Sequence, residues 1–232
     1  MKPFSFQKFQ IQQSKTVFRV GTDAVLLGAM ANVEKANKVL EVGTGTGLIS
    51  LMLAQRNSAA NFLGLDINPE AVALTQENFK NSPFCSRLKN SLIDFKEFIT
   101  TEKFDFIVSN PPYFEESSSS KDKIARQTVE LNFEQLINKS SLLLADKGIL
   151  SVIIPYEVGE VFVDLASKNQ LYLVRKVNIF GIENSKVKRL ILEFSPYKMD
   201  FIESDFTIEK SPRNYSDQYL ELTKEFHVFK QK

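Results

Sequence analysis

A hydrophobic segment that runs into closely spaced glycines limits the folds open to this chain more than any other feature. Residues 39–42 are Val-Leu-Glu-Val, as in a buried strand, and Gly43, Gly45 and Gly47 then alternate with threonines before an apolar, helix-like stretch that begins at Leu48. Glycine tolerates positive φ and lets the backbone approach a ligand closely. A glycine-rich turn between a strand and a helix also directs the N–H groups of the helix N-terminus at a bound polar group. The segment therefore predicts an α/β protein with a ligand at this turn.

An acidic residue follows the turn at the distance expected of a ribose-binding group. Residues 61–66 form a second strand-like segment that ends at Asp66, about 20 residues beyond the turn, where a carboxylate can accept hydrogen bonds from both ribose hydroxyls. Leu48 occupies the place of the last glycine in the dinucleotide fingerprint G-x-G-x-x-G, so the turn differs from that motif. The alternative is that Asp66 only ends a strand before a helix start at Asn68-Pro69.

The segment Asn110-Pro111-Pro112-Tyr113 follows another strand-like run, residues 104–109. The prolines fix φ and remove two backbone donors, so the segment leaves the sheet as a stiff turn rich in acceptors. Asn110 Oδ1 and the Pro111 carbonyl can then face one point beside the Tyr113 ring. That arrangement suits a planar group that carries an NH₂, such as the edge of adenine or a carboxamide. The alternative is a proline-rich loop that merely ends a strand.

Strand-like and helix-like segments alternate along the chain without a clear domain boundary. This alternation predicts a doubly wound α/β fold, with a mostly parallel sheet covered by helices on both faces. The short connection between the last two strands favours a C-terminal antiparallel hairpin. We expect one domain, residues 1–232, with residues 1–36 as an N-terminal cap and residues 37–232 as the core. The predicted strands are 38–43, 61–66, 86–90, 104–109, 149–154, 171–180 and 187–195, and the predicted helices are 24–31, 46–56, 69–81, 133–145 and 157–168.

The polar motifs all follow predicted strands. Ligands of doubly wound sheets bind at the carboxyl ends of the strands. Residues 41–47, Asp66 and Asn110 all fall at that edge, so one crevice can hold a cofactor and a substrate.

Composition excludes several classes of protein. No stretch approaches the roughly 20 apolar residues of a membrane span, and the first residues lack the apolar region of a secretion signal, so we expect a cytoplasmic protein. Cys85 is the single cysteine and His227 the single histidine. These counts argue against a disulfide framework, a metal cluster and a serine-histidine triad.

The net charge of +1 gives no strongly basic surface. Affinity for nucleic acid rests on Lys and Arg that neutralise phosphates, so it would have to come from local patches. Lys2, Lys8, Lys15 and Arg19 form one candidate patch, although each can equally be a solvated surface charge. The charge is compatible with a tRNA partner but does not point to it.

The ordered motifs resemble those of class I S-adenosylmethionine-dependent methyltransferases, in the subgroup that methylates exocyclic or amide nitrogens. The matching positions are residues 41–47, Asp66, Asp94 and residues 110–113. The resemblance covers most of the chain and implies a Rossmann-like fold with a seven-stranded, mostly parallel sheet.

The two ends of the chain are similar to those of the bacterial valine-tRNA adenine N6-methyltransferase family. The matching segments are residues 6–9, 20–29 and 215–226. His227-Val228 departs from the family, in which a Tyr-Leu pair is more frequent at this place. The resemblance implies methylation of adenine 37, beside the anticodon of valine tRNA.

The resemblance also assigns roles to single residues. Gly43, Gly45, Gly47 and Glu41 would face the methionine portion of S-adenosylmethionine, Asp66 its ribose, Asp94 its adenine amine, and Thr22 and Asp23 its amino-acid end. Asn110 and Pro111 would accept the two N6 hydrogens of the substrate, and Tyr113 would stack on its base. The alternatives are that Asp94 caps a following helix and that Thr22 and Asp23 cap a helix from Ala24.

Two other functions remain open at this stage. The first is methylation of a glutamine amide in a release factor, whose carboxamide presents the same NH₂ group. About 38 residues precede the glycine turn, and they do not look like the helical bundle of those enzymes. The second is a noncatalytic module that binds RNA or another partner. Every assigned chemical position is intact, which argues against this second alternative. The oligomeric state is not predicted.

Overall fold

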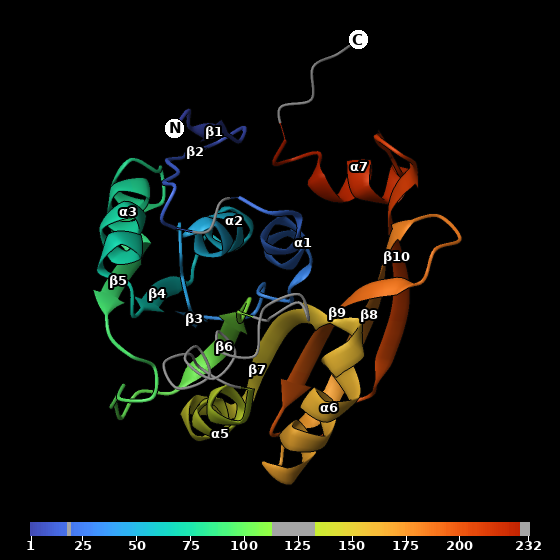
Figure 1. Ribbon diagram of the computed structural model, residues 1–232. Helices are drawn as coiled ribbons and strands as arrows, with labels where there is room; N and C mark the ends of the chain where they lie inside the picture. The colour runs from blue at the N-terminus through green and yellow to red at the C-terminus, as the bar shows by residue number, and fades with distance from the viewer. Residues whose placement is uncertain (18–19, 113–132, 228–232) are drawn as a thin grey trace, which may run out of the picture.

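A computed structural model of the chain describes residues 1–17, 20–112 and 133–227 (Figure 1). Its helices are α1 (Thr22–Met30), α2 (Leu48–Arg56), α3 (Pro69–Lys80), α5 (Phe133–Leu143), α6 (Gly159–Lys168) and α7 (Asp217–Thr223), with short 3₁₀ turns at Cys85–Arg87 and Tyr156–Val158. Its strands are β1 (Phe4–Ser5), β2 (Gln10–Ile11), β3 (Lys38–Val42), β4 (Asn61–Asp66), β5 (Leu88–Leu92), β6 (Phe104–Ser109), β7 (Leu144–Pro155), β8 (Tyr172–Ile182), β9 (Val187–Ser195), β10 (Ile202–Ser211) and β11 (Asn214–Tyr215).

Within these residues, nine strands form one sheet in the order β11-β10-β8-β9-β7-β6-β3-β4-β5. The strands from β7 to β5 in this order are parallel, whereas β9 is antiparallel to both β7 and β8. The mostly parallel sheet and the C-terminal antiparallel hairpin β8–β9 are therefore confirmed. Alternating strands and helices produce this arrangement because a parallel pair needs a crossover connection.

The sheet is larger than the seven strands that the sequence predicts. The seven predicted strands lie side by side, and β10 extends them by pairing parallel to β8, with β11 beyond it. Phe206 is the one buried side chain of β10, and its other residues are exposed or half-buried. Most of β10 lies at the edge of the sheet, because β11 pairs with it only at Glu209 and Ser211. Such a strand lacks the alternation of apolar and polar residues by which strands are recognised.

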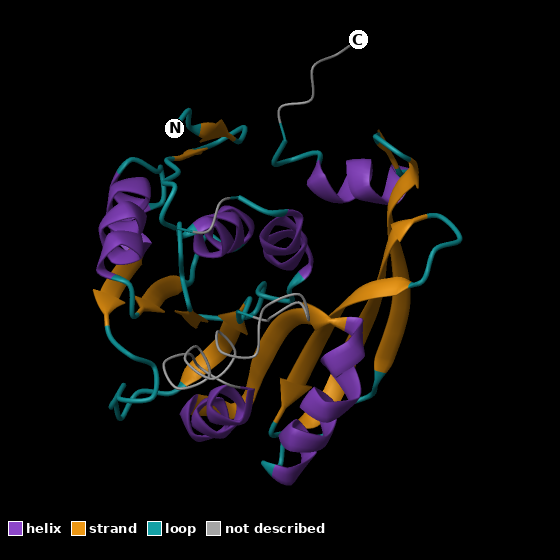
Figure 2. Ribbon diagram, in the orientation of Figure 1, coloured by secondary structure: helices purple, strands orange, loops and turns teal. Residues whose placement is uncertain are grey.

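Helices cover both faces of the sheet, as Figure 2 shows. Helices α1, α2 and α3 lie on one face, and α5 and α6 lie on the other. Neighbouring residues of β6 point to opposite sides: Phe106 and Val108 join the first core, and Ile107 joins the second. Alternate strand residues thus fill two hydrophobic layers, as expected of a sheet buried on both faces.

The N-terminal cap packs against the C-terminal segment. Phe6 forms an isolated bridge with His227, and the Gln7 amide donates to the Phe226 carbonyl over 2.9 Å. The rings of Phe6 and Phe9 stack at 4.7 Å, and the Phe6 ring also stacks on His227. The two ends of the described chain therefore hold each other in place beside α2.

Helix α1 begins two residues before the predicted position. Gly21 is its N-cap residue, and Thr22 and Asp23 lie in its first turn without capping it. The alternative that these two side chains cap a helix from Ala24 is therefore wrong. None of the helices in the described residues is long and apolar enough to span a membrane.

Candidate active site

The strand register brings the predicted site residues together at the carboxyl edge. Val42 at the end of β3 pairs with Leu65 of β4 on one side and with Ser109 of β6 on the other. Neighbouring strands lie about 4.8 Å apart. Because Gly43, Asp66 and Asn110 each follow one of these paired residues, they occupy adjacent positions along this edge. The positions predicted to hold a cofactor thus lie directly beside the one predicted to hold a substrate.

The glycines at the end of β3 adopt the left-handed conformation that the sequence predicts. Gly43, Gly45 and Gly47 have φ angles of 74°, 56° and 78°. A Cβ atom on Gly47 would lie 2.6 Å from the Phe79 ring, so this glycine allows α3 to pack against the turn. A Cβ on Gly43 or Gly45 would meet no described atom within 4 Å. These two positions leave backbone facing open space, where a ligand can lie close to it.

Glu41 is buried beneath the turn and holds its shape. One carboxyl oxygen, Oε2, accepts hydrogen bonds from Thr44 Oγ1 over 2.9 Å, from the Ser50 amide over 3.1 Å and from Ser50 Oγ. Burial raises the pKa of this carboxyl to about 7. Glu41 therefore links the turn to the first residues of α2, and its predicted orientation toward a cofactor stays a prediction.

Asp66 connects the ends of β3 and β4. Its Oδ2 accepts from the Gly45 amide over 2.8 Å, and its Oδ1 accepts from the Asn68 amide over 2.9 Å. A carboxylate has about four acceptor sites, so both oxygens keep capacity for a ligand. Asp66 is the last residue of β4, and Asn68, whose side chain accepts from the Glu70 amide, is the N-cap of α3. Both the ribose contact and the alternative that Asp66 only ends a strand are compatible with this position.

Two buried polar residues of α3 hold the turn from the opposite side. Thr75 Oγ1 donates to the Gly45 carbonyl over 2.8 Å, and Asn78 Nδ2 donates to the Thr46 carbonyl over 2.8 Å. Asn78 also exchanges bonds with the backbone of Gln12, at 2.8 Å and 3.2 Å. Neither residue was singled out from the sequence. Their spacing of three residues places them on the apolar face of a helix beside Phe79, and this could have indicated that they are buried.

Asn110 is the unusual member of the site. Ser109 Oγ donates to the Val42 carbonyl over 2.8 Å and fixes the end of β6 against β3. Asn110 Oδ1 is buried and has no hydrogen-bond partner among the residues that the structure describes. Buried acceptors in native proteins are nearly always bonded, so this oxygen is suited to a donor that arrives with a ligand. Pro111 is buried and Pro112 is exposed, while Tyr113 lies outside the described residues.

The remaining predicted residues lie at the same edge. Asp94 follows β5, where its Oδ1 accepts from the Lys96 amide over 2.9 Å and its Oδ2 pairs with Lys96 Nζ at 3.2 Å. A turn follows it, so the alternative that Asp94 caps a helix is wrong. Asp23 forms an ion pair with Arg189 Nε at 3.0 Å, at the start of β9.

Two aliphatic side chains are exposed next to Asp66. Ile67 is 47 % exposed and Leu92, the register partner of Asp66 on β5, is 53 % exposed. Apolar side chains beside a polar site suit the faces of a flat ring. Among the described residues, no group of three or more His, Cys, Asp or Glu side chains could hold a metal ion.

Comparison with known proteins identifies the family. Residues 12–169 match the model of the methyltransferase small domain. A tRNA1(Val) (adenine(37)-N6)-methyltransferase of Flavobacteriaceae bacterium strain 3519-10 is 51 % identical over 230 residues, which are 99 % of this chain and all of that protein. This chain belongs to the tRNA1(Val) (adenine(37)-N6)-methyltransferase family.

Other members of this methyltransferase family are also similar along their whole length. The Flavobacterium psychrophilum protein is 41 % identical, with 97 % of this chain and 99 % of that protein covered. Among solved structures, a predicted O-methyltransferase of Agrobacterium tumefaciens matches with a TM-score of 0.71 at 16 % identity, covering 88 % of this chain and 96 % of the other. At that identity the likeness shows the class I methyltransferase fold and nothing more specific.

Proposed function

We propose that this protein transfers a methyl group from S-adenosylmethionine to N6 of adenine 37 in valine tRNA. The names of its full-length relatives, at 51 % and 41 % identity, support this activity. The observation that carries it is the buried Oδ1 of Asn110 beside Gly43, which has no hydrogen-bond partner among the described residues, because an exocyclic amine would supply that donor. The partner is the anticodon loop of a tRNA, which places the enzyme in the cytoplasm. The chain acts as one domain, with residues 1–36 as its cap.

The residues of the glycine turn fit the proposed cofactor. The open space over Gly43 and Gly45 accommodates the methionine portion of S-adenosylmethionine, with Glu41 holding the turn. Asp66 binds the ribose hydroxyls through its remaining acceptor sites.

The adenine and amino-acid ends of the cofactor extend to either side of the turn. Ile67 and Leu92 flank the adenine ring, and Asp94 accepts from its amine. Thr22 and Asp23 face the amino-acid end, with Arg189 holding the Asp23 carboxylate in place.

The substrate residues act on the lone pair of the nitrogen. An N6 amine shares this pair with the purine ring and is a poor nucleophile, whereas the cofactor supplies a reactive methyl on a sulfonium. Asn110 Oδ1 and the Pro111 carbonyl accept the two N6 hydrogens, which favours a pyramidal nitrogen and directs its lone pair at the methyl. Tyr113 stacks on the base, for about 1–3 kcal/mol. The nitrogen would become cationic as it takes the methyl and the S–CH₃ bond breaks, and one of its two protons would then pass to water. Because such a cation is acidic, no strong general base is required.

The first alternative function has a different methyl acceptor, and the second has no turnover. A glutamine amide of a release factor would satisfy Asn110 equally well, but the full-length relatives carry the names of tRNA methyltransferases. A noncatalytic module would tolerate loss of a site residue, whereas the described positions of this site are all in place at one edge. Both observations favour the RNA methyltransferase.

Transfer of labelled methyl from S-adenosylmethionine tests the proposal. The acceptors are a valine tRNA transcript, the same transcript with guanine in place of adenine 37, and a release factor. We expect label only in the first RNA, as N6-methyladenosine after digestion to nucleosides. Label in the guanine transcript would contradict the position, label in the release factor alone would move the substrate to protein, and no label would favour a binding module.

A further inference from the structure

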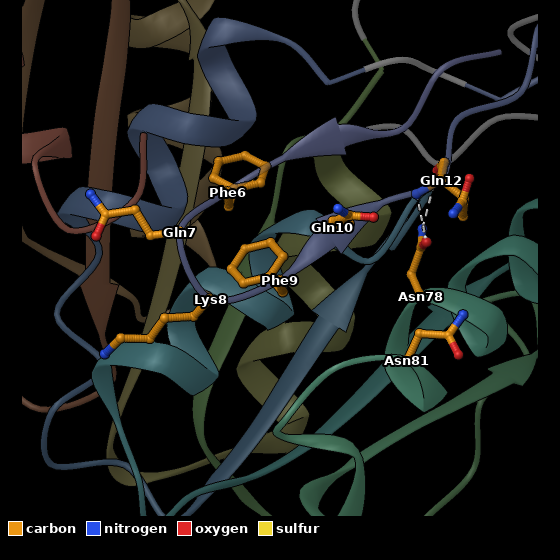
Figure 3. Close-up of a pocket in the computed structure, with 8 residues that line it drawn as sticks. All are labelled: Phe6, Gln7, Lys8, Phe9, Gln10, Gln12, Asn78 and Asn81. Carbon is orange, nitrogen blue, oxygen red and sulfur yellow. Dashed lines mark hydrogen bonds between the residues drawn. The ribbon is translucent and has the colours of Figure 1, made fainter. Parts of the chain in front are cut away.

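A groove of about 440 Å³ lies outside the active site, between cap residues 6–12 and the end of α3 (Figure 3). Its volume falls within the range of small-molecule sites and suffices for one nucleotide. Asn78 of α3 and Asn81, the C-cap residue of that helix, line one side, and the cap supplies the rest of the lining. Figure 3 shows the hydrogen bonds that join Asn78 to Gln12 at one end of this groove.

The lining is rich in amides and carries one positive charge. None of the eight lining residues is Asp or Glu, and Lys8 contributes the single ammonium group. In the described part of the chain, the side-chain amides of Gln10, Gln12 and Asn81 form no hydrogen bond, and Lys8 forms no ion pair. An amide group offers both donors and an acceptor, which suits the edge of a nucleobase. The ammonium group suits a phosphate.

The floor of the groove is fixed before any ligand arrives. The Phe6 and Phe9 rings are buried and stack on each other at 4.7 Å. Gln7 donates from Nε2 to the carbonyls of Lys224 and His227, which ties this part of the cap to the C-terminal segment. A preformed groove loses little conformational entropy when a ligand binds.

One side chain separates the groove from the cofactor turn. Asn78 is buried, and the same Nδ2 atom that reaches the Gln12 carbonyl over 3.2 Å also donates to the Thr46 carbonyl over 2.8 Å. The groove is therefore close enough to the active site for one RNA loop to reach both.

We propose that this groove binds an unpaired nucleotide of the tRNA substrate other than the methylated adenine. Gln10, Gln12 and Asn81 contact the edge of its base, and Lys8 contacts its phosphate. Single-stranded loops expose base edges in this way, whereas a paired helix does not. The inference rests on the proposed function, since that function supplies the RNA.

A pair of double variants tests the groove. Gln10→Ala with Asn81→Ala removes two free amides, and Gln76→Ala with Asn138→Ala removes two exposed amides of the same types elsewhere. Binding of a fluorescent anticodon stem-loop of valine tRNA is measured in the presence of S-adenosylhomocysteine, together with the steady-state kinetics of methylation. We expect the groove variant to bind the RNA about tenfold more weakly, with KM for tRNA raised equally. The kcat and the affinity for S-adenosylmethionine should not change, and the control should match the wild type.

A salt titration adds a second readout. Lys8→Ala should make the dependence of log Kd on log salt concentration shallower by roughly one phosphate contact. An unchanged slope, or a groove variant that binds RNA as tightly as its control, would overturn the proposal. Failure of the proposed function looks different, because the wild type would then bind the stem-loop through the groove but leave adenine 37 unmethylated.

Discussion

The two halves of the active-site edge differ in how their polar groups are satisfied. On the cofactor half, the side chains that surround the glycine turn already form hydrogen bonds to residues 44–46 before any ligand is present. These side chains are Glu41, Asp66, Thr75 and Asn78. On the substrate half, Asn110 presents a buried acceptor without a partner in the described residues. The cofactor half is shaped by the fold itself, whereas we propose that the substrate half is completed by the molecule that reacts.

This difference predicts that mutations in the two halves affect different steps. Loss of a bond in the cofactor half loosens the turn, so it should weaken cofactor binding or stability. Loss of the Asn110 acceptor removes no side-chain hydrogen bond of Oδ1 among the described residues, so it should appear mainly in turnover. An interaction made only with the reacting group raises kcat and leaves ground-state binding unchanged.

Asn110→Ala gives the largest expected effect. Removal of one preorganised polar group that faces the reacting centre costs about 10²–10³ in rate, and we expect a loss near the upper end of that range, with kcat about 1,000-fold below the wild type. The dissociation constant of S-adenosylmethionine should stay within about twofold. Asn110→Asp keeps acceptor oxygens at this place and should lose less. Calorimetric titration measures the dissociation constant, and single-turnover kinetics measure the rate of methyl transfer. Equal rates for the wild type and Asn110→Ala would contradict the role proposed for Asn110.

Glu41→Gln tests the buried carboxyl of the cofactor half. The unfolded chain loses the Glu41 proton near pH 4.5 and the folded chain near pH 7, so the folded state binds more protons between these values. The stabilising contribution is complete below pH 4.5 and is lost as the pH rises through 7, by on the order of 3 kcal/mol. Urea unfolding at pH 4.5, 6 and 8 should show this fall in the wild type relative to Glu41→Gln. If the free energy of unfolding changed with pH in the same way in both proteins, the raised pKa of Glu41 would be contradicted.

Asp66→Ala should weaken cofactor binding while sparing the chemical step. The variant loses the acceptor of the Gly45 and Asn68 amides as well as the predicted ribose contact. A hydrogen bond to a charged group contributes about 2 kcal/mol, so we expect roughly 30-fold weaker binding of S-adenosylmethionine. The kcat at saturating cofactor should fall much less. Normal cofactor affinity in this variant would overturn the arrangement of the cofactor half.

Thr75→Val has the smallest expected effect, because it removes a single hydrogen bond of the cofactor half. The substitution keeps the shape of the side chain and removes only the donor to the Gly45 carbonyl. Loss of one neutral hydrogen bond, about 1 kcal/mol, should weaken cofactor binding about fivefold. The KM for tRNA should not change. A larger change in KM for tRNA than in cofactor affinity would show that the two halves are not separable in this way.

The glycine turn and Asp66 could be placed from the sequence because their signals are local. Left-handed φ angles favour glycine wherever they occur, and the spacing from the turn to Asp66 follows from one strand and one helix. The strand positions followed from hydrophobic runs, and the register then brought Gly43 and Asn110 side by side.

The supports of the turn could not be predicted in the same way. Thr75 and Asn78 share the apolar face of α3 with Phe79, but their polar side chains do not predict burial, and only the packing of α3 against the turn buries them. Strand β10 was missed because its edge position leaves most of its side chains exposed. The helix-capping alternatives for Asp94, Thr22 and Asp23 failed because favourable residue types do not fix where a helix begins.

A crystal structure with S-adenosylhomocysteine and the anticodon stem-loop of valine tRNA tests the central claim most directly. The claim predicts adenine 37 out of the loop, with its N6 atom within hydrogen-bond distance of Asn110 Oδ1 and aligned with the cofactor sulfur. A structure in which N6 bonds elsewhere and Asn110 Oδ1 finds a partner within the protein would contradict it.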